Sequence, residues 1–159
     1  MSEDESVDSE DQVTQWVTFN LDQEMYGINV MNVQEVLPCA EIAPVPGAPP
    51  FVLGIINLRG NVVTVIDTRM RFGLPTMEDM SKSRVVVIEA NDQVAGILVD
   101  SVSEVIGVKG SEIDTAPSVG NEDSSRYIYG VVSRENELLI LVDVHKLLTK
   151  EEWADIAAL

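Results

Sequence analysis

Few residues of this chain could carry out chemistry. Cys39 and His145 are the single cysteine and the single histidine, so they form the one candidate pair of nucleophile and base. Two aspartates, Asp67 and Asp143, each follow an apolar run and could act as an acid and a base. A lone arginine, Arg59, precedes a glycine between the runs G-I-I-N-L and V-V-T-V-I. Its guanidinium could serve catalysis, contact a carboxylate of a partner, or pair with an acid of its own chain.

The surrounding sequence argues against catalysis. The chain contains no phosphate-binding loop G-x-x-x-x-G-K-[ST], no G-x-G-x-x-G, no H-E-x-x-H and no G-x-S-x-G. With one cysteine and one histidine, an internal disulfide is excluded and a structural zinc site is not expected. We therefore expect neither an enzyme nor a bound cofactor or metal.

Composition limits the class of partner. The chain has 159 residues, 45% of them apolar, and a formal net charge of −17. Because no basic stripe is present, binding to nucleic acid or to anionic lipid is not expected, and the partners should be proteins that offer basic patches. No apolar run approaches the roughly 18 residues that span a bilayer, and the N-terminus is acidic where a signal peptide would be basic. We expect a cytoplasmic protein without direct membrane insertion.

The first residues differ from the rest of the chain. Residues 1–12 are rich in acids and nearly free of apolar side chains, which predicts a disordered acidic tail before a domain at 13–159. After the tail, short runs rich in β-branched residues alternate with turn signals, which indicates a mainly β protein. At the C-terminus, Thr149 and Glu152 have the spacing of a capping box, and Trp153, Ile156 and Ala157 fall on one face of the predicted helix.

An internal repeat organises the β-rich part. Shifted by 76 residues, G-I-I-N-L-R-G-N-V-V-T-V-I-D aligns with G-V-V-S-R-E-N-E-L-L-I-L-V-D, so that Gly54 matches Gly130 and Asp67 matches Asp143. Shifted by 69 residues, D-Q-E-M-Y-G-I-N-V aligns with N-D-Q-V-A-G-I-L-V. The duplication suggests a small barrel in each half, since closure removes exposed strand edges. It also explains both aspartates as helix caps at equivalent strand ends.

The repeat sharpens the interpretation of Arg59. Its counterpart in the second copy is Glu135, so the hairpin turn does not itself need a positive side chain. The arginine is therefore either a contact for a carboxylate of a partner or a surface residue paired with one of the chain's own acids. His145 occupies the repeat position of Arg69, which favours an ordinary surface site over a catalytic one.

Three stretches resemble the CheW-type coupling proteins of bacterial chemotaxis. They are G-I-I-N-L-R-G-N-V-V-T-V-I-D-T-R, Y-G-I-N-V-M-N-V-Q-E-V and I-L-V-D-V-H-K-L-L-T-K-E-E. The likeness covers essentially everything after the acidic tail. It implies a mainly β fold of two intertwined, small, five-stranded, SH3-like β-barrels with short helices and a C-terminal helix. It further implies a non-enzymatic scaffold, recruited to membrane receptor arrays, that binds the cytoplasmic tip of methyl-accepting chemoreceptors and the regulatory domain of the histidine kinase CheA.

The resemblance also implies which residues bind partners. Glu35 and Arg59 match the acidic and basic functional positions of the family, and Gly54 and Asn57 match its motif. A receptor groove between the lobes would be lined by apolar residues: Val33, Val36, Leu37 and Val99. Where some relatives place Glu-Phe in a loop that contacts the kinase, this chain has Ser118 and Val119, which puts that contact in question.

Two alternatives stay open from the sequence. One is a coupling module with the same fold in another receptor pathway, such as surface motility or second-messenger control. The other is an enzyme with a site between the lobes, which would require polar groups where the groove positions are apolar.

Overall fold

The computed structural model describes residues 12–38, 41–75, 81–114, 126–135 and 137–158. The first copy of the repeat forms β1 (Val13–Leu21), β2 (Glu24–Asn29), β3 (Val33–Pro38), β4 (Val52–Leu58) and β5 (Asn61–Ile66). The second copy forms β6 (Arg84–Ala90), β7 (Gln93–Val99), β8 (Ser101–Lys109), β9 (Ile128–Arg134) and β10 (Glu137–Val142). The helical segments are η3 (Val30–Asn32), α1 (Thr68–Arg71), η4 (Gly110–Glu112), η5 (Val144–Lys146) and α3 (Lys150–Ala157).

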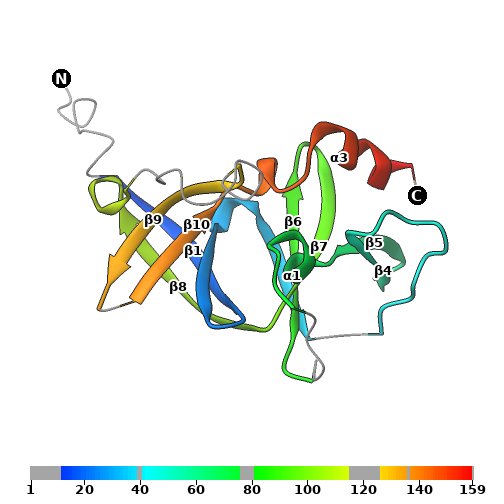
Figure 1. The fold of residues 1–159 in the computed structure, drawn as a ribbon, viewed down its shortest axis with the longest axis horizontal. Helices are drawn as coiled ribbons and strands as arrows, with labels where there is room; N and C mark the ends of the chain where they lie inside the picture. Colours follow the sequence, from blue (N-terminus) through cyan, green and yellow to red (C-terminus); the bar gives the residue numbers. More distant parts are fainter. Residues whose placement is uncertain (1–11, 39–40, 76–80, 115–125, 136, 159) are drawn as a thin grey trace.

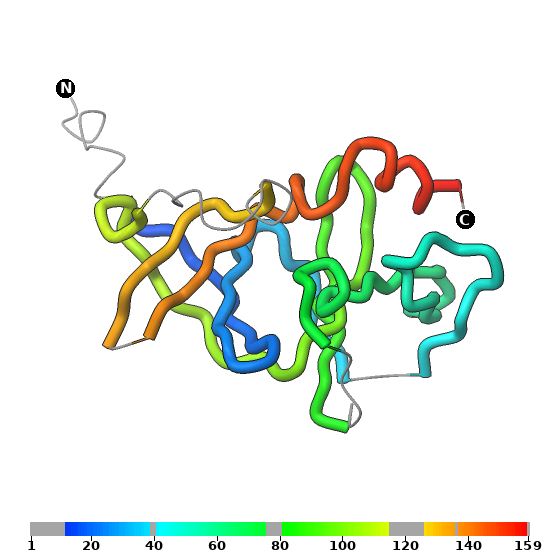
Figure 2. The backbone as a smooth tube through the Cα atoms, in the orientation of Figure 1, coloured from blue at the N-terminus to red at the C-terminus, as the bar shows by residue number. Residues whose placement is uncertain are grey.

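The strands form two five-stranded sheets, which lie side by side in Figures 1 and 2. We call the sheet β8-β1-β2-β10-β9 lobe A and the sheet β3-β6-β7-β5-β4 lobe B. When each strand is replaced by its repeat counterpart, one order becomes the other. Each lobe thus takes two strands from one copy and three from the other, so the intertwined arrangement is confirmed. The simpler expectation of one barrel in each half is wrong, because the copies exchange strands.

Parallel pairing joins the exchanged strands. β2 pairs with β10 in lobe A, and β5 pairs with β7 in lobe B, while the other neighbours are antiparallel. A single bridge then links the chain after one edge strand to the opposite edge strand: Asp114 to Val131 in lobe A and Ala43 to Ile55 in lobe B. These bridges curl each sheet back on itself, which leaves less exposed edge.

Successive side chains of a strand point to opposite faces, so a strand whose two faces are both buried is apolar without interruption. On β6, Val85 and Val87 face the core inside lobe B, whereas Val86 and Ile88 face a central core built from both lobes. Both faces of the strand are therefore buried, as an uninterrupted V-V-V-I run requires. Separating the lobes would expose the central core, and each fully buried aliphatic side chain contributes roughly 1.5–3 kcal/mol.

Helix α3 packs on lobe B, where it forms the red end of the chain in Figure 1. The predicted capping box is present: the Thr149 hydroxyl accepts a hydrogen bond from the Glu152 amide, and the Glu152 carboxylate accepts one from the Thr149 amide. Trp153 and Ile156 are buried, whereas Ala157 is exposed, so the buried stripe is narrower than predicted.

The predicted acidic tail falls almost wholly outside the described residues. Gln12 is described, and its carbonyl accepts a hydrogen bond of 3.1 Å from the Gly110 amide. Among the described residues, no helix is long and apolar enough to cross a membrane.

Candidate functional site

The hairpin between β4 and β5 positions Arg59. Asn57 on β4 accepts a hydrogen bond of 2.8 Å from the Gly60 amide through its side-chain oxygen. Arg59 and Gly60 both have positive φ, 53° and 89°, as a two-residue turn that matches the strand twist requires. The repeat counterpart of Arg59, Glu135, has a φ of 40°. A positive φ at the first turn residue is therefore kept in both copies while its charge is reversed.

Gly54 shapes the same hairpin at its base. It lies next to a register shift between β4 and β5, and Gly130 lies at the equivalent shift between β9 and β10. A Cβ at Gly54 would lie 2.3 Å from the carbonyl oxygen of Ala43, which is far inside van der Waals contact. Gly54 therefore serves the close approach of two backbone segments and offers no side chain to a partner.

Arg59 is paired within its own chain. Its two terminal nitrogens donate hydrogen bonds of 2.8 Å and 2.6 Å to the two carboxylate oxygens of Glu35 on β3. Of the alternatives that the sequence left open, the structure realises the pairing with an acid of the same chain. It also brings together the two charged residues that the family resemblance singled out, 24 positions apart in sequence.

The pair lies on the surface and carries full charges. The Arg59 side chain is 69% exposed and the Glu35 side chain 24% exposed. Hydrogen bonds from Arg59 lower the pKa of the Glu35 carboxyl below its ordinary value, and the carboxylate in turn raises the pKa of Arg59. At neutral pH the site is an ion pair with one edge of the guanidinium in solvent.

The equivalent end of lobe A has a different charge. The counterparts of Glu35 and Arg59 there are Glu104 and Glu135, and both line a cavity of about 120 Å³ together with Glu137 and Arg134. The two lobes have the same topology, yet the end of lobe B holds a matched pair and the end of lobe A holds an excess of acids. The molecule therefore offers two chemically distinct ends.

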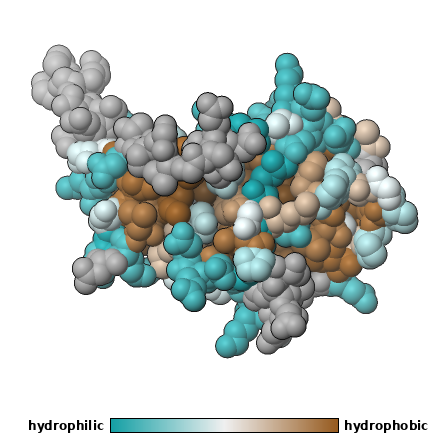
Figure 3. Space-filling model, viewed as in Figure 1, coloured by the Kyte–Doolittle hydropathy of each residue, from teal (hydrophilic) through white to brown (hydrophobic). Residues whose placement is uncertain are grey.

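The four apolar residues expected to line a groove differ in their exposure to solvent. Val36 on β3 is 39% exposed, while Val33 and Leu37 are partly buried against the central core and the core of lobe B. Val99 is 1% exposed and belongs to the central core. Its side chain is buried on β7 and is therefore not available to a partner. Figure 3 shows apolar side chains gathered on the viewed face over both lobes.

Some predicted site residues cannot be placed. Ser118, Val119 and Cys39 lie outside the described residues. Within the described part of the chain, no group of three or more histidine, cysteine, aspartate or glutamate side chains could hold a metal ion.

Two of the residues considered for catalysis, Asp67 and Asp143, have a structural role as helix caps. Asp67 accepts a hydrogen bond from the Met70 amide at the start of α1, and Asp143 accepts one from the His145 amide at the start of η5. Both therefore cap helical turns, as the repeat predicted. His145 is exposed, with Asn32 3.4 Å from its imidazole.

Sequence reasoning missed two further arginines. Arg69 on α1 donates two hydrogen bonds, of 2.9 Å and 2.6 Å, to Asp100 after β7, and lies 3.8 Å from Asp22 between β1 and β2. Arg71 donates to Glu152 at 2.5 Å and lies over the ring of Phe51. The first arginine ties lobe A to lobe B, and the second holds α3 in place. The sequence T-R-M-R directly after the Asp67 cap could have indicated these contacts, because it places both arginines on one short helix.

Comparison with known proteins shows the family to which the chain belongs. The model of the CheW-like domain family matches residues 15–152. Chemotaxis protein CheW of Treponema pallidum is 35% identical over 94% of this chain and 90% of its own length, and that of Bacillus subtilis is 36% identical over 85% and 86%. The crystal structure of the scaffolding protein TtCheW from Thermoanaerobacter tengcongensis superposes with a TM-score of 0.79 at 33% identity, covering 86% of this chain and 92% of that one. The chain belongs to the CheW family of chemotaxis proteins.

Proposed function

We propose that this protein is a non-enzymatic adaptor that couples chemoreceptors to the histidine kinase CheA in chemotaxis signalling and array assembly. Family membership over residues 15–152 and the likeness to a scaffolding protein support this function. The proposed functional unit is the domain 13–159, preceded by the acidic tail. Its partners would be the regulatory domain of CheA and the cytoplasmic tip of methyl-accepting receptors, which would bring a cytoplasmic protein to membrane receptor arrays.

The observation that carries the proposal is the exposed ion pair beside β3. Arg59 and Glu35 lie at one end of lobe B, and the half-exposed Val36 follows Glu35 on the edge strand β3, with its side chain on the other face of that strand. Exposed charges of this kind typically set the orientation of a partner in transient protein interfaces, where apolar contacts supply affinity. We assign Glu35, Arg59, Val33, Val36 and Leu37 to the docking surface.

Other assigned positions act indirectly. Asn57 fixes the turn that carries Arg59, and Gly54 permits the backbone approach at the base of the hairpin. Val99 belongs to the central core, against which Val33 packs. A kinase contact through Ser118 and Val119 stays a proposal that the described residues do not address.

Reconstitution tests the adaptor function. Receptor-containing membranes and the kinase CheA are combined with or without the purified chain, and both kinase activity and co-sedimentation with the membranes are measured. We expect the chain to sediment with receptors, to recruit the kinase and to raise phosphorylation. If it sediments with neither partner and leaves kinase activity unchanged, the proposed coupling function is wrong.

Charge exchange within the pair separates two roles of the site. Arg59→Glu and Glu35→Arg should each reduce binding, because each places two like charges together. The double variant restores an internal ion pair. If binding stays low in the double variant, the individual charges face a partner; if binding recovers, the pair acts by holding the hairpin.

A further inference from the structure

The end of lobe A that carries the β9–β10 hairpin contains a small cavity of about 120 Å³. Its lining combines apolar side chains that pack in or against the core of lobe A with four charged residues. The apolar ones are Met25, Ile106 and Leu139, and the charged ones are Glu104, Arg134, Glu135 and Glu137. Pockets that enclose a small-molecule ligand usually measure about 300 Å³ or more. This cavity therefore fits the end of a single side chain.

Two hydrogen bonds hold the backbone of Glu104 at the cavity. The hydroxyl of Thr18, a 1% exposed residue that also lines the cavity, donates to the Glu104 carbonyl oxygen at 2.7 Å and accepts from the Glu104 amide at 3.0 Å. The Glu104 carboxylate takes no part in these bonds, and none of the ion pairs between described residues includes it. It is therefore an acceptor on a fixed base.

The lining holds more acids than bases. Arg134 and Glu137 are opposite each other in the register of β9 and β10, so their charges compensate each other across the hairpin. Glu104 and Glu135 then have no basic residue left in the lining. Two carboxylates beside one partly apolar cavity repel each other, which favours the entry of a cation.

The repeat indicates which cation fits. The counterpart of Glu104 in lobe B is Glu35, and there the Arg59 guanidinium donates hydrogen bonds of 2.8 Å and 2.6 Å to the two carboxylate oxygens. The β4–β5 and β9–β10 hairpins have the same register up to their turns. In lobe A the turn position of Arg59 is occupied by Glu135, so the chain does not supply a guanidinium from this position.

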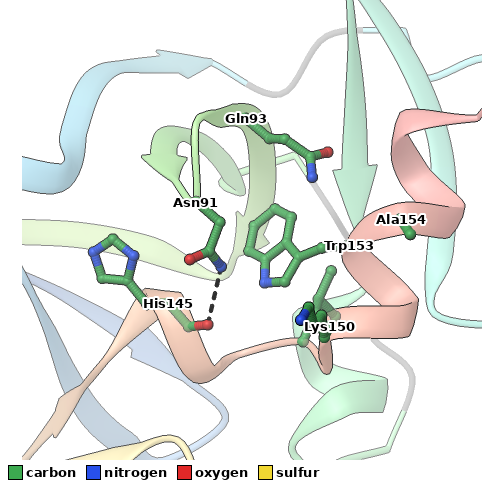
Figure 4. Close-up of a pocket in the computed structure, with 7 residues that line it drawn as sticks. Asn91, Gln93, His145, Lys150, Trp153 and Ala154 are labelled. Carbon is green, nitrogen blue, oxygen red and sulfur yellow. Dashed lines mark hydrogen bonds between the residues drawn. The ribbon is translucent and has the colours of Figure 1, made fainter.

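The larger pocket beside α3 does not share this character. It measures about 460 Å³, and Figure 4 shows the residues from the β6–β7 turn, η5 and α3 that line it. The Asn91 side chain donates a hydrogen bond of 3.2 Å to the His145 carbonyl, drawn as the dashed line, and the lining contains no acid. The excess of carboxylates thus distinguishes the lobe A cavity.

We propose that the lobe A cavity binds the guanidinium group of an arginine exposed on a partner protein. The Glu104 carboxylate accepts two parallel hydrogen bonds from it, as Glu35 does from Arg59, and Glu135 adds the attraction of a second negative charge. The methylene groups of the arginine pack against the apolar part of the lining. The site is separate from the docking surface, and the inference does not depend on the adaptor function.

Nuclear magnetic resonance of the ¹⁵N-labelled full chain tests the proposal with three capped tripeptides, which place arginine, lysine or citrulline between two glycines. We expect the arginine peptide to move the amide signals of Glu104 and Glu135 with saturation and to leave those of Glu35 and Arg59 in place, because that pair is already formed. The lysine peptide should bind about tenfold more weakly, because an ammonium group lacks the planar fork of donors. The uncharged citrulline peptide should not bind.

Three variants of the chain provide the controls. Glu104→Gln should weaken binding of the arginine peptide about tenfold, and it keeps the fold because Thr18 bonds only the backbone of this residue. Glu135→Arg should abolish binding, since it places a guanidinium in the turn as lobe B does. Glu41→Arg makes the same change of charge at an exposed residue after β3 and should bind as the wild type does.

Several results would overturn the proposal. One is the absence of any shift at Glu104 and Glu135 up to about 20 mM arginine peptide. Equal binding of the lysine or citrulline peptide would show that no guanidinium is recognised. Unchanged binding in Glu104→Gln or Glu135→Arg, or an equal loss in Glu41→Arg, would show that the peptide responds only to the net charge of the chain.

Discussion

Arg59 and Glu35 connect the two edges of one sheet through a pair of parallel hydrogen bonds. Glu35 lies on β3, at one edge of lobe B, and Arg59 lies in the turn after β4, at the other edge. The pair can form only because the sheet curls until its edges meet. The formation of this exposed charge pair therefore depends on closure of the barrel. The same two residues belong to the surface that we assign to partners.

Replacing Arg59 by alanine should reduce function while leaving the fold intact. The side chain is 69% exposed, and an exposed ion pair contributes little to stability, so we expect the Tm to change by less than about 2 °C. Receptor-dependent activation of the kinase should fall severalfold in the reconstituted assay. Circular dichroism measures the first quantity and phosphorylation the second.

Glu135→Ala is the matched control for this variant. It alters the equivalent turn residue of lobe A, where φ is 40°, without removing a cation. If Arg59→Ala unfolds the protein, or if Glu135→Ala lowers kinase activation as much, then Arg59 has no particular role in docking.

The repeat predicted much of the fold, because the shift of 76 residues maps β4 and β5 onto β9 and β10 with identical bounds. It could not predict the partner of Arg59, since that contact depends on the curvature of the sheet. It also could not separate Val36 from Val99, because both are valines on strands and only the direction of each side chain decides which is exposed. The strand exchange came from the family resemblance, since duplication alone is equally compatible with one barrel per half.

Acidification should weaken the anchoring of α3. Burial raises the pKa of Glu152, but hydrogen bonds from Thr149 and Arg71 outweigh that effect and hold the pKa below its ordinary value. A carboxyl whose pKa is lowered on folding stabilises the protein above its unfolded pKa, and this contribution is lost as the pH falls through the folded value. Glu152→Gln should therefore destabilise the chain at pH 7 by about 1 kcal/mol and much less near pH 3. Urea unfolding at both pH values measures this, and an equal loss at the two would contradict it.

Arg69 should matter more for stability than Arg59, although each makes two hydrogen bonds to one carboxylate. The Arg69 side chain is 15% exposed and joins α1 to segments of both lobes. We expect Arg69→Gln to lower the Tm by about 4 °C or more and Arg59→Gln by less than about 2 °C. Thermal unfolding of the two variants under one set of conditions makes the comparison. Equal decreases in Tm would mean that the Arg69 contacts between the lobes stabilise the protein no more than the exposed pair of Arg59 and Glu35 does.

Gly54→Ala should destabilise the whole domain and thereby lose function for a structural reason. The added Cβ would lie 2.3 Å from the Ala43 carbonyl oxygen, and a backbone atom cannot move aside as a flexible side chain can. We expect a loss of at least about 2 kcal/mol in the free energy of unfolding. Gly60→Ala is the matched control, because its Cβ meets nothing within 4 Å and only its φ of 89° is unfavourable, which costs roughly 1 kcal/mol. If Gly54→Ala instead unfolds like the wild type yet fails to bind receptors or kinase, then Gly54 contacts a partner directly and the close approach to Ala43 is not its role.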